Sequence, residues 1–422
     1  MKYIVFIFLL FFTKILSFLG SNMLLTVMHY LTLLVSITSF IIFISRYRWS
    51  HVTFYIFMFA IITPIYASIQ SHRIFDQPFY MGFASLRYFI FIMFGYFLII
   101  NNYDYRLLLK QINNINLCVA LFSIIAILIL HIDPSTLFSY QVNNNVLGVG
   151  SENVGDSEGV GGVNVRGARF FACSTLMFIS LIYYQLASLR KGGKDNYIRL
   201  FILIIYILFV HKGRQPVAVM GVVYIVYFLK MKGVSTKRLL MVVAPILLFI
   251  IFLAIDENLL FRFTTILDGE KSDDFSTLAR IWEVNQILPY IQDNLLLGVG
   301  NLSAHFRNGG FQAFLGSNFY LADIGIIGAL ARGGLILIII YLGLYVSLWN
   351  KTRFINDRNC RQFMRYMILS YVVLLICLCN DVMFADNCIQ FALLFYPLYS
   401  QKNNNKYISP LKYNKLSKFI YV

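Results

Sequence analysis

The chain has 422 residues, of which 59% are hydrophobic and 13% charged, with a formal net charge of +16. Soluble globular domains carry about 25% charged residues, so this composition excludes an ordinary soluble enzyme. The cations do not indicate a nucleic-acid-binding protein, because they gather in short segments between apolar runs. Since apolar runs recur along the whole length, the sequence predicts an all-α, polytopic membrane protein.

About 12 transmembrane helices are expected in a single transmembrane domain, residues 1–400, followed by a basic cytoplasmic tail, residues 401–422. The expected spans lie near residues 3–20, 24–44, 53–70, 83–100, 113–131, 169–189, 198–211, 215–230, 239–256, 321–349, 364–380 and 383–400. We expect the first run to be a retained helix and not a cleaved signal peptide, because Lys14 interrupts it and no small-residue cleavage site follows. The segment 321–349 is long enough to include an interfacial half-helix before its span.

The distribution of charge predicts the orientation. With the N-terminus inside, the cytoplasmic segments hold 23 of the 35 Lys and Arg residues but only three acidic residues, Asp104, Asp195 and Asp357. The positive-inside rule therefore predicts that both ends of the chain are cytoplasmic. Arginine predominates among the remaining cations, and its planar fork suits phosphate better than lysine does.

Two long periplasmic loops follow from this topology. Residues 132–168 are rich in Gly, Asn and Val, and their glycines do not match a nucleotide-binding fingerprint. Residues 257–320 include TLARIWEVNQILPYI, whose apolar spacing predicts a short amphipathic helix. The six cysteines lie mostly within or beside apolar runs, at spacings that indicate neither disulfides nor a zinc site. Neither a metal nor a cofactor is expected.

The stretch VHKGRQP, residues 210–216, is predicted to be a periplasmic turn between two short spans. About 16 residues are available for each span, roughly 24 Å of helix, which is less than the ~30 Å hydrocarbon core. The turn should therefore lie at the depth of the lipid headgroups. Lys212 and Arg214 could bind a lipid-linked phosphate there, or simply anchor the chain to bulk lipid phosphate.

Three stretches together suggest a family. VRGARFFACSTLMFISLIY (165–183) opens a span after an arginine-bearing loop, and FVHKGRQPVAVMGVVYIVYF (209–228) places Gly-Arg at a periplasmic turn. LARIWEVNQILPYIQDNLLLGVGN (278–301) then precedes GSNFYLADIGIIGAL (316–330) at the end of the large loop. In order and sidedness this arrangement resembles the O-antigen polymerase and ligase superfamily, the Wzy-type polymerases and their relatives, over roughly residues 165–345.

The resemblance implies a glycosyltransferase of the bacterial inner membrane, with its active site facing the periplasm. Its donor would be an oligosaccharide on undecaprenyl pyrophosphate, and the pyrophosphate lipid would be the leaving group. The matching arginines, Arg169, Arg214 and Arg280, would bind pyrophosphate. Arg166 and Lys212, beside two of them, and Arg332, within or near a span, are further candidates, although Arg332 could also snorkel to the interface.

A sugar hydroxyl that attacks an anomeric carbon can need a general base. Asp323, His305 and Glu283 are the candidates. Their structural alternatives are a helix-capping Asp, a solvated loop His, and a Glu that forms a helix-surface pair with Arg280. Ligases of the superfamily carry a histidine near the start of the span after the large loop, where this chain reads SNFYLAD. A polymerase therefore fits better than a ligase.

The expected partners are the undecaprenyl-pyrophosphate-linked oligosaccharide, membrane lipid and a chain-length regulator in the membrane, with no nucleic acid. A different class of protein, a flippase or transporter for lipid-linked glycans, stays open as an alternative. Transporters often show internal repeats and broken helices, and the sequence shows no convincing internal repeat.

Overall fold

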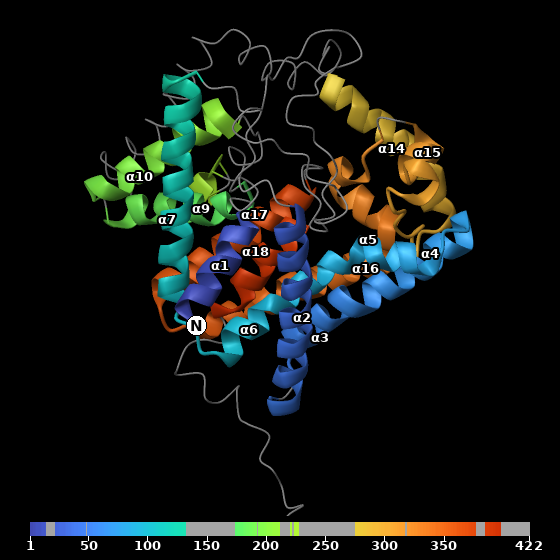
Figure 1. The fold of residues 1–422 in the computed structure, drawn as a ribbon, viewed down its shortest axis with the longest axis horizontal. Coiled ribbons are helices and arrows are strands. Elements are labelled where there is room, and N and C mark those ends of the chain that lie inside the picture. Colours follow the sequence, from blue (N-terminus) through green and yellow to red (C-terminus); the bar gives the residue numbers. More distant parts are fainter. Residues whose placement is uncertain are drawn as a thin grey trace, which may run out of the picture.

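The computed structural model describes residues 1–13, 22–47, 49–131, 174–191, 193–211, 220–221, 223–227, 275–316, 319–376 and 385–397. Every regular element in this part of the chain is helical (Figure 1). This agrees with the all-α prediction. The loop expected at 132–168, the span expected at 239–256 and the tail at 401–422 lie outside the described residues.

The elements include α-helices (α) and short 3-10 or π helices (η). In the first half they are α1 (Lys2–Phe12), α2 (Asn22–Arg46), α3 (His51–Phe57), η2 (Met58–Ile62), α4 (Thr63–Phe75), α5 (Phe79–Leu86), η3 (Arg87–Met93), α6 (Phe94–Ile100), α7 (Tyr105–Ile124) and η4 (Ile125–Ile129). They continue with α9 (Ser174–Lys191), α10 (Lys194–Ile205), η5 (Tyr206–His211), α14 (Phe275–Asp293), η6 (Phe306–Asn308), α15 (Phe311–Leu315), η7 (Leu321–Ile324), α16 (Gly325–Lys351), η8 (Thr352–Phe354), α17 (Arg358–Ile376) and α18 (Ala385–Phe395).

Among the described residues, 5 helical stretches are long and apolar enough to cross a membrane. They are Thr26–Arg46, His51–Phe75, Phe79–Ile100, Tyr105–Ile129 and Gly325–Phe354. Each overlaps a span expected from the sequence, and Lys2–Phe12 and Leu176–Arg190 are shorter apolar helices at two further expected positions. The structure therefore supports a multi-pass membrane protein, and the expectation of about 12 spans goes beyond what it shows.

Local distortions interrupt several of these stretches. Pro64 cannot donate a backbone hydrogen bond and its ring would crowd the carbonyl four residues earlier. The π-helical turn η2 comes just before it, where the Thr63 hydroxyl donates to the Met58 carbonyl at 3.0 Å. In the next stretch the 3-10 segment η3 separates α5 from α6.

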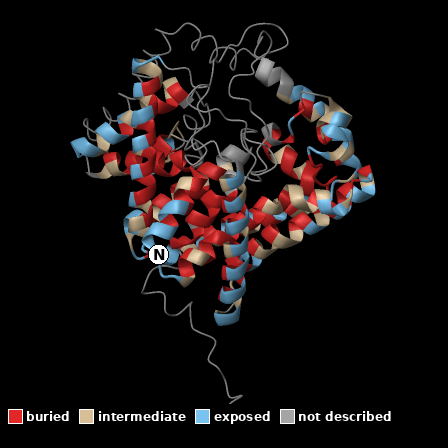
Figure 2. Cartoon of the chain, in the orientation of Figure 1, coloured by how far each residue is buried: buried red, intermediate tan, exposed pale blue. Residues whose placement is uncertain are grey.

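The core has two parts. The larger cluster joins α1 to the helices around it, including α6, α17 and α18, and buried residues fill this centre of the molecule (Figure 2). Outside it, α2 exposes an apolar stripe made of Leu31, Leu34, Ile37 and Ile41. These positions recur at helical spacing, and such a stripe suits contact with lipid.

Candidate functional site

We call residues 275–316 and 319–324 the cap. Most of the second core cluster lies in the cap. This cluster brings α14, η7 and the turn between them against the end of α4 and the start of α16. Its buried members are Phe75, Ile287, Ile291, Val299, Leu302, Phe311, Phe319, Leu321, Ile324 and Ala331. In Figure 1 the cap lies at the right, in yellow and orange, beside α4 and α5. It contains the described part of the expected 257–320 loop, including α14, a helix at the expected position. Ile287 and Ile291 of this helix are buried, whereas Ile281, Trp282 and Leu288 of the expected apolar face are exposed.

The cap is joined to α16 where that helix is broken. Gly334 has φ 60° and ψ −161°, which is not a helical conformation. The break changes the pairing of backbone groups on either side of it, and a buried backbone group needs a partner. Segment 295–300 supplies partners on both sides. The N–H groups of Val299 and Gly300 donate to the Ala331 and Arg332 carbonyls at 2.6 and 3.1 Å.

On the other side of the break, Leu335 and Ile336 donate their N–H groups to the Leu295 and Leu296 carbonyls at 3.0 and 3.3 Å. The Gly333 carbonyl accepts from the Tyr66 hydroxyl of α4 at 3.0 Å. The LLLGVG segment and the ARGGLI segment are therefore one paired unit, although about 35 residues separate them in the chain.

Glycine is required at this pairing. Gly298 and Gly300 have φ of 69° and 86°, a region that L side chains rarely adopt. A Cβ at Gly300 would lie 2.2 Å from the Ala67 carbonyl oxygen, and one at Gly334 would lie 2.3 Å from the Leu296 carbonyl oxygen. The glycine spacing in the sequence motif thus has a structural cause: it lets two backbones approach each other.

A buried polar cluster fastens the cap to α4 and α5. The fully buried Gln77 donates through Nε2 to Ser71 Oγ at 3.1 Å and to the Asn301 carbonyl at 3.0 Å. Its Oε1 accepts from the Ser303 N–H at 2.7 Å. Asn301 Nδ2 donates to Ser85 Oγ at 2.8 Å. This cluster was not predicted from the sequence, where its one signal is Gln77 in the short DQP turn between apolar runs.

The three candidate bases occupy different surroundings. Glu283 is 2% exposed and its Oε1 accepts from the Tyr320 N–H at 2.9 Å, so it is not on the helix surface as a pair with Arg280 would require. That alternative is wrong for this side chain. His305 is exposed on a turn, where its backbone N–H donates to Ser303 Oγ at 3.4 Å. Asp323 lies in η7, and its side chain is outside the described part of the structure.

Two of the candidate cations are described. Arg280 is partly exposed on α14, one turn before Glu283. Arg332 is 8% exposed and lies at the broken part of α16. Because η7 contacts both α14 and α16, the cap brings the segments of Arg280, Glu283, Asp323 and Arg332 together. Arg166, Arg169, Lys212 and Arg214 lie outside the described residues, so their predicted meeting with Arg280 stays a prediction.

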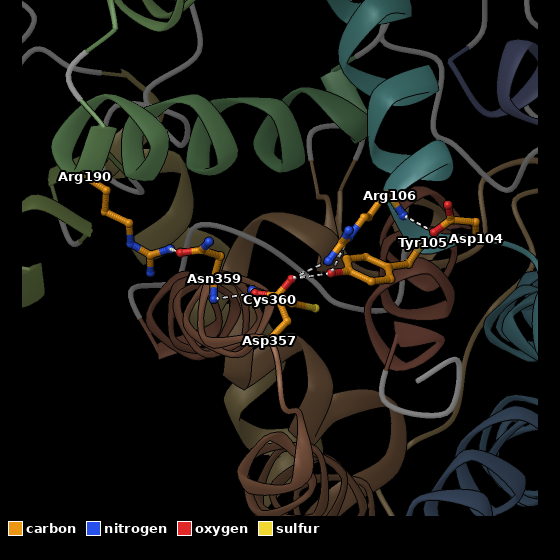
Figure 3. A network of polar contacts seen from close by, with 7 residues as sticks. All are labelled: Asp104, Tyr105, Arg106, Arg190, Asp357, Asn359 and Cys360. Atoms are coloured by element: carbon orange, nitrogen blue, oxygen red, sulfur yellow. Dashed lines mark hydrogen bonds and ion pairs between the residues drawn. The ribbon is translucent and has the colours of Figure 1, made fainter. Parts of the chain in front are cut away.

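A second polar cluster lies at the far end of α16 (Figure 3). Asp357 Oδ2 accepts from the Tyr105 hydroxyl at 2.6 Å and lies 3.5 Å from Arg106 Nη2. Its Oδ1 accepts from the N–H groups of Asn359 and Cys360 at 2.8 and 3.3 Å, which caps the start of α17. Arg190 Nη1 donates to Asn359 Oδ1 at 2.5 Å. This cluster connects three segments that the sequence predicts to be cytoplasmic.

Among the described residues, no group of three or more His, Cys, Asp or Glu side chains could hold a metal ion. Comparison of the sequence with protein-family models and with curated proteins finds no match.

Proposed function

We propose that the chain is a membrane glycosyltransferase that joins undecaprenyl-pyrophosphate-linked oligosaccharide repeat units into a polysaccharide of the O-antigen or capsule type at the periplasmic face. The observation that carries this proposal is the pairing of segment 295–300 with the broken helix α16. LLLGVGN lies in the cap, and the described part of GSNFYLADIGIIGAL includes η7, which contacts both α14 and α16. Arg332 of α16 and Glu283 of α14 are buried.

The residues suit transfer from a pyrophosphate lipid. Breaking the glycosidic bond leaves negative charge on the pyrophosphate, and preorganised arginines in a poorly hydrated site stabilise such charge. Arg169, Arg214 and Arg280 are proposed for this role, with Arg166, Lys212 and Arg332 as further cations. No cofactor or metal is part of the proposed reaction.

Glu283 is better placed as a positioning residue than as a general base. It is buried and accepts the Tyr320 N–H, three residues before Asp323. It thereby orients the segment that carries Asp323, which is the better remaining candidate for the base, with His305 on the exposed turn as the other. The proposed partners are the lipid-linked oligosaccharide, membrane lipid and a chain-length regulator in the membrane.

The flippase alternative also has an observation in its favour, because transporters often contain broken helices. In α16, however, the break at Gly334 lies close to the start of the helix. About 17 residues follow it, roughly 25 Å of helix, so the break is near one membrane surface and not at the midplane. This position favours a surface-facing enzyme. A ligase of the same superfamily is the remaining alternative.

A deletion strain tests the proposal. Loss of a polymerase should leave single repeat units on the cell surface, whereas loss of a flippase removes the glycan and loss of a ligase leaves bare lipid core. The measurement is a surface-glycan ladder, with the wild-type chain returned on a plasmid as the control. A deletion strain with long chains of normal length would contradict a polymerase function.

The complemented strain also tests Arg214. Arg214→Ala should abolish long chains at a near-normal protein level, because a lost guanidinium fork removes two donors to phosphate. Arg214→Lys should rescue only in part, since the charge survives and the fork does not. Lys212→Ala serves as the matched control and should have a much smaller effect. Normal ladders from Arg214→Ala would identify the turn as a lipid anchor.

A further inference from the structure

The cap carries a row of exposed apolar side chains along α14. Ile281, Leu288 and Leu295 are 54%, 41% and 48% exposed, and they recur every seven residues. Seven residues are about two turns of an α-helix, so the three positions follow one line along α14 and the turn after it. Leu296, at the end of this line, is 61% exposed. Contiguous large apolar side chains on a surface mark a contact with lipid or with protein.

The line lies between a buried face and a polar edge of α14. At about 100° per residue, Ile287 and Ile291 lie on one side of the line, and both are buried in the second core cluster. The exposed residues Asn285 and Gln292 lie on the other side of it. An apolar edge next to a polar one is typical of a helix that lies at the surface of a bilayer.

The membrane-spanning part of α16 has an exposed apolar stripe as well. Leu335, Ile339, Leu342 and Val346 are all exposed, and their spacing of four, three and four residues places them on one face of the helix. They belong to the stretch Gly325–Phe354, which is long and apolar enough to cross a membrane. A face of this kind on a spanning helix contacts the acyl chains of lipid.

The two apolar surfaces meet at the break in α16. The N–H groups of Leu335 and Ile336 donate to the carbonyls of Leu295 and Leu296 at 3.0 and 3.3 Å, so the line on the cap ends where the stripe on α16 begins. About 17 residues of α16 follow Gly334, roughly 25 Å of helix, which puts this junction near one boundary of the ~30 Å hydrocarbon core. The exposed leucines of the cap are therefore at the depth of the bilayer surface.

We propose that this edge of the cap, made of Ile281, Leu288, Leu295 and Leu296, docks on the lipid of the adjacent membrane leaflet. Its side chains enter the boundary between headgroups and acyl chains, about 5–10 Å deep, and the polar edge of α14 stays in contact with headgroups and water. Continuity with the stripe on α16 identifies lipid as the occupant, in place of a second protein chain. The inference concerns how the cap is held at the membrane and does not rest on the proposed function.

The test is site-directed spin labelling of the full chain in phosphatidylcholine nanodiscs. Each variant carries one cysteine in a chain whose six native cysteines are replaced. Leu288→Cys and Leu295→Cys probe the edge, Ile339→Cys on α16 is the lipid-facing control, and Ala304→Cys on an exposed turn of the cap is the water-facing control. Electron paramagnetic resonance compares collisions of the nitroxide with oxygen, which concentrates in lipid, and with a nickel chelate, which stays in water.

Nitroxides at positions 288 and 295 should favour oxygen, as the one at position 339 does, whereas the nitroxide at position 304 should favour the nickel chelate. A preference for nickel at 288 and 295 would overturn the proposal, because the edge would then face water. Protection from both probes would also overturn it, since protein would then cover the edge. Spin–spin distances between two chains would in that case distinguish a second copy from another segment of the same chain.

A pair of polar substitutions tests whether the side chains themselves hold the edge in lipid. In the Leu288→Cys chain, Ile281→Asn together with Leu295→Asn should shift the label from oxygen towards nickel, whereas Asn285→Gln, on the polar edge, should leave it unchanged. The thermal midpoint in detergent should stay the same in both, because the replaced side chains are exposed. An unchanged oxygen preference in the doubly substituted chain would contradict docking by this edge. Its unfolding would show that these side chains pack against protein, which would contradict the proposal equally.

Discussion

At the scale of single residues, Asp357 has polar contacts to Tyr105, Arg106 and two backbone N–H groups. Partial burial acts to raise the pKa of Asp357, but the Tyr105 hydroxyl, two backbone N–H groups and the Arg106 guanidinium favour the ionised form more strongly. The pKa of this carboxyl is therefore below its usual value. A group with a lowered folded-state pKa contributes stability above its unfolded pKa, near 4, and that stability is lost as the pH falls through the folded value.

Asp357→Asn should lower the thermal midpoint at pH 7, because a charge-assisted contact is worth about 1.5–3 kcal/mol and asparagine retains only the capping function. The difference from wild type should shrink as the pH falls below about 4, since the wild-type carboxyl then becomes protonated. Unfolding followed by tryptophan fluorescence between pH 3 and 7 measures this. Asp195→Asn, at an exposed position in the first turn of α10, is the control. A difference that is constant with pH would show that the charge of Asp357 is irrelevant.

The membrane side of the charged residues could be predicted from the sequence, whereas their burial and their partners could not. The sequence placed Asp104 and Asp357 in segments of the same sidedness, and the structure brings those segments together. It could not show that Glu283 is buried, because Glu283 follows Arg280 at a spacing that is equally typical of a surface pair. Arg87 was visible as a charge in an apolar run, but His29, which accepts a hydrogen bond from it, lies 58 positions earlier on another helix. Contacts between segments that are distant in the chain produce no periodic pattern in the sequence.

At the scale of elements, the break in α16 is a paired structure and not a loose hinge. Hydrophobic length predicted a long helical segment at 321–349, and the helix begins at Gly325 and ends at Lys351. Periodicity could not reveal that LLLGVG crosses it, because the pairing uses backbone groups and leaves the side-chain pattern unchanged. Gly298 and Gly300 belong to a stretch that carries the resemblance, whereas Gly334, on the other side of the contact, lies beyond the quoted stretches and was not predicted.

Gly334→Ala should disrupt this pairing. A side chain at φ 60° and ψ −161° is strained by about 1–3 kcal/mol, and the added Cβ would also overlap the Leu296 carbonyl oxygen. We expect a thermal midpoint lower by several degrees and a reduced protein level in the membrane. At Gly221 an added Cβ would meet nothing within 4 Å, so Gly221→Ala should be at least as stable as wild type. Equal stability of the two variants would show that the cap does not depend on this pairing.

At the scale of the whole molecule, α16 separates the cap from the Asp357 cluster. The cap packs at its start, and the Asp357 cluster follows its end. The part of α16 after its break at Gly334 spans roughly 25 Å, close to the ~30 Å hydrocarbon core of a bilayer. The cap and the Asp357 cluster should therefore lie on opposite sides of a membrane. The Arg-rich side is expected to be cytoplasmic, because positively charged residues are retained on that side.

Single-cysteine labelling tests this arrangement. In a chain whose six native cysteines are replaced, Ala304→Cys on the cap and Asn101→Cys near the Asp357 cluster both place a thiol at an exposed position. An impermeant maleimide should label Cys at position 304 in cells whose outer membrane alone has been opened, because the cap is expected to face the periplasm. The thiol at position 101 should react only after the inner membrane is opened as well. Labelling of both before that step would place the two clusters on one side, and the reverse pattern would invert the predicted orientation and exclude a periplasmic cap.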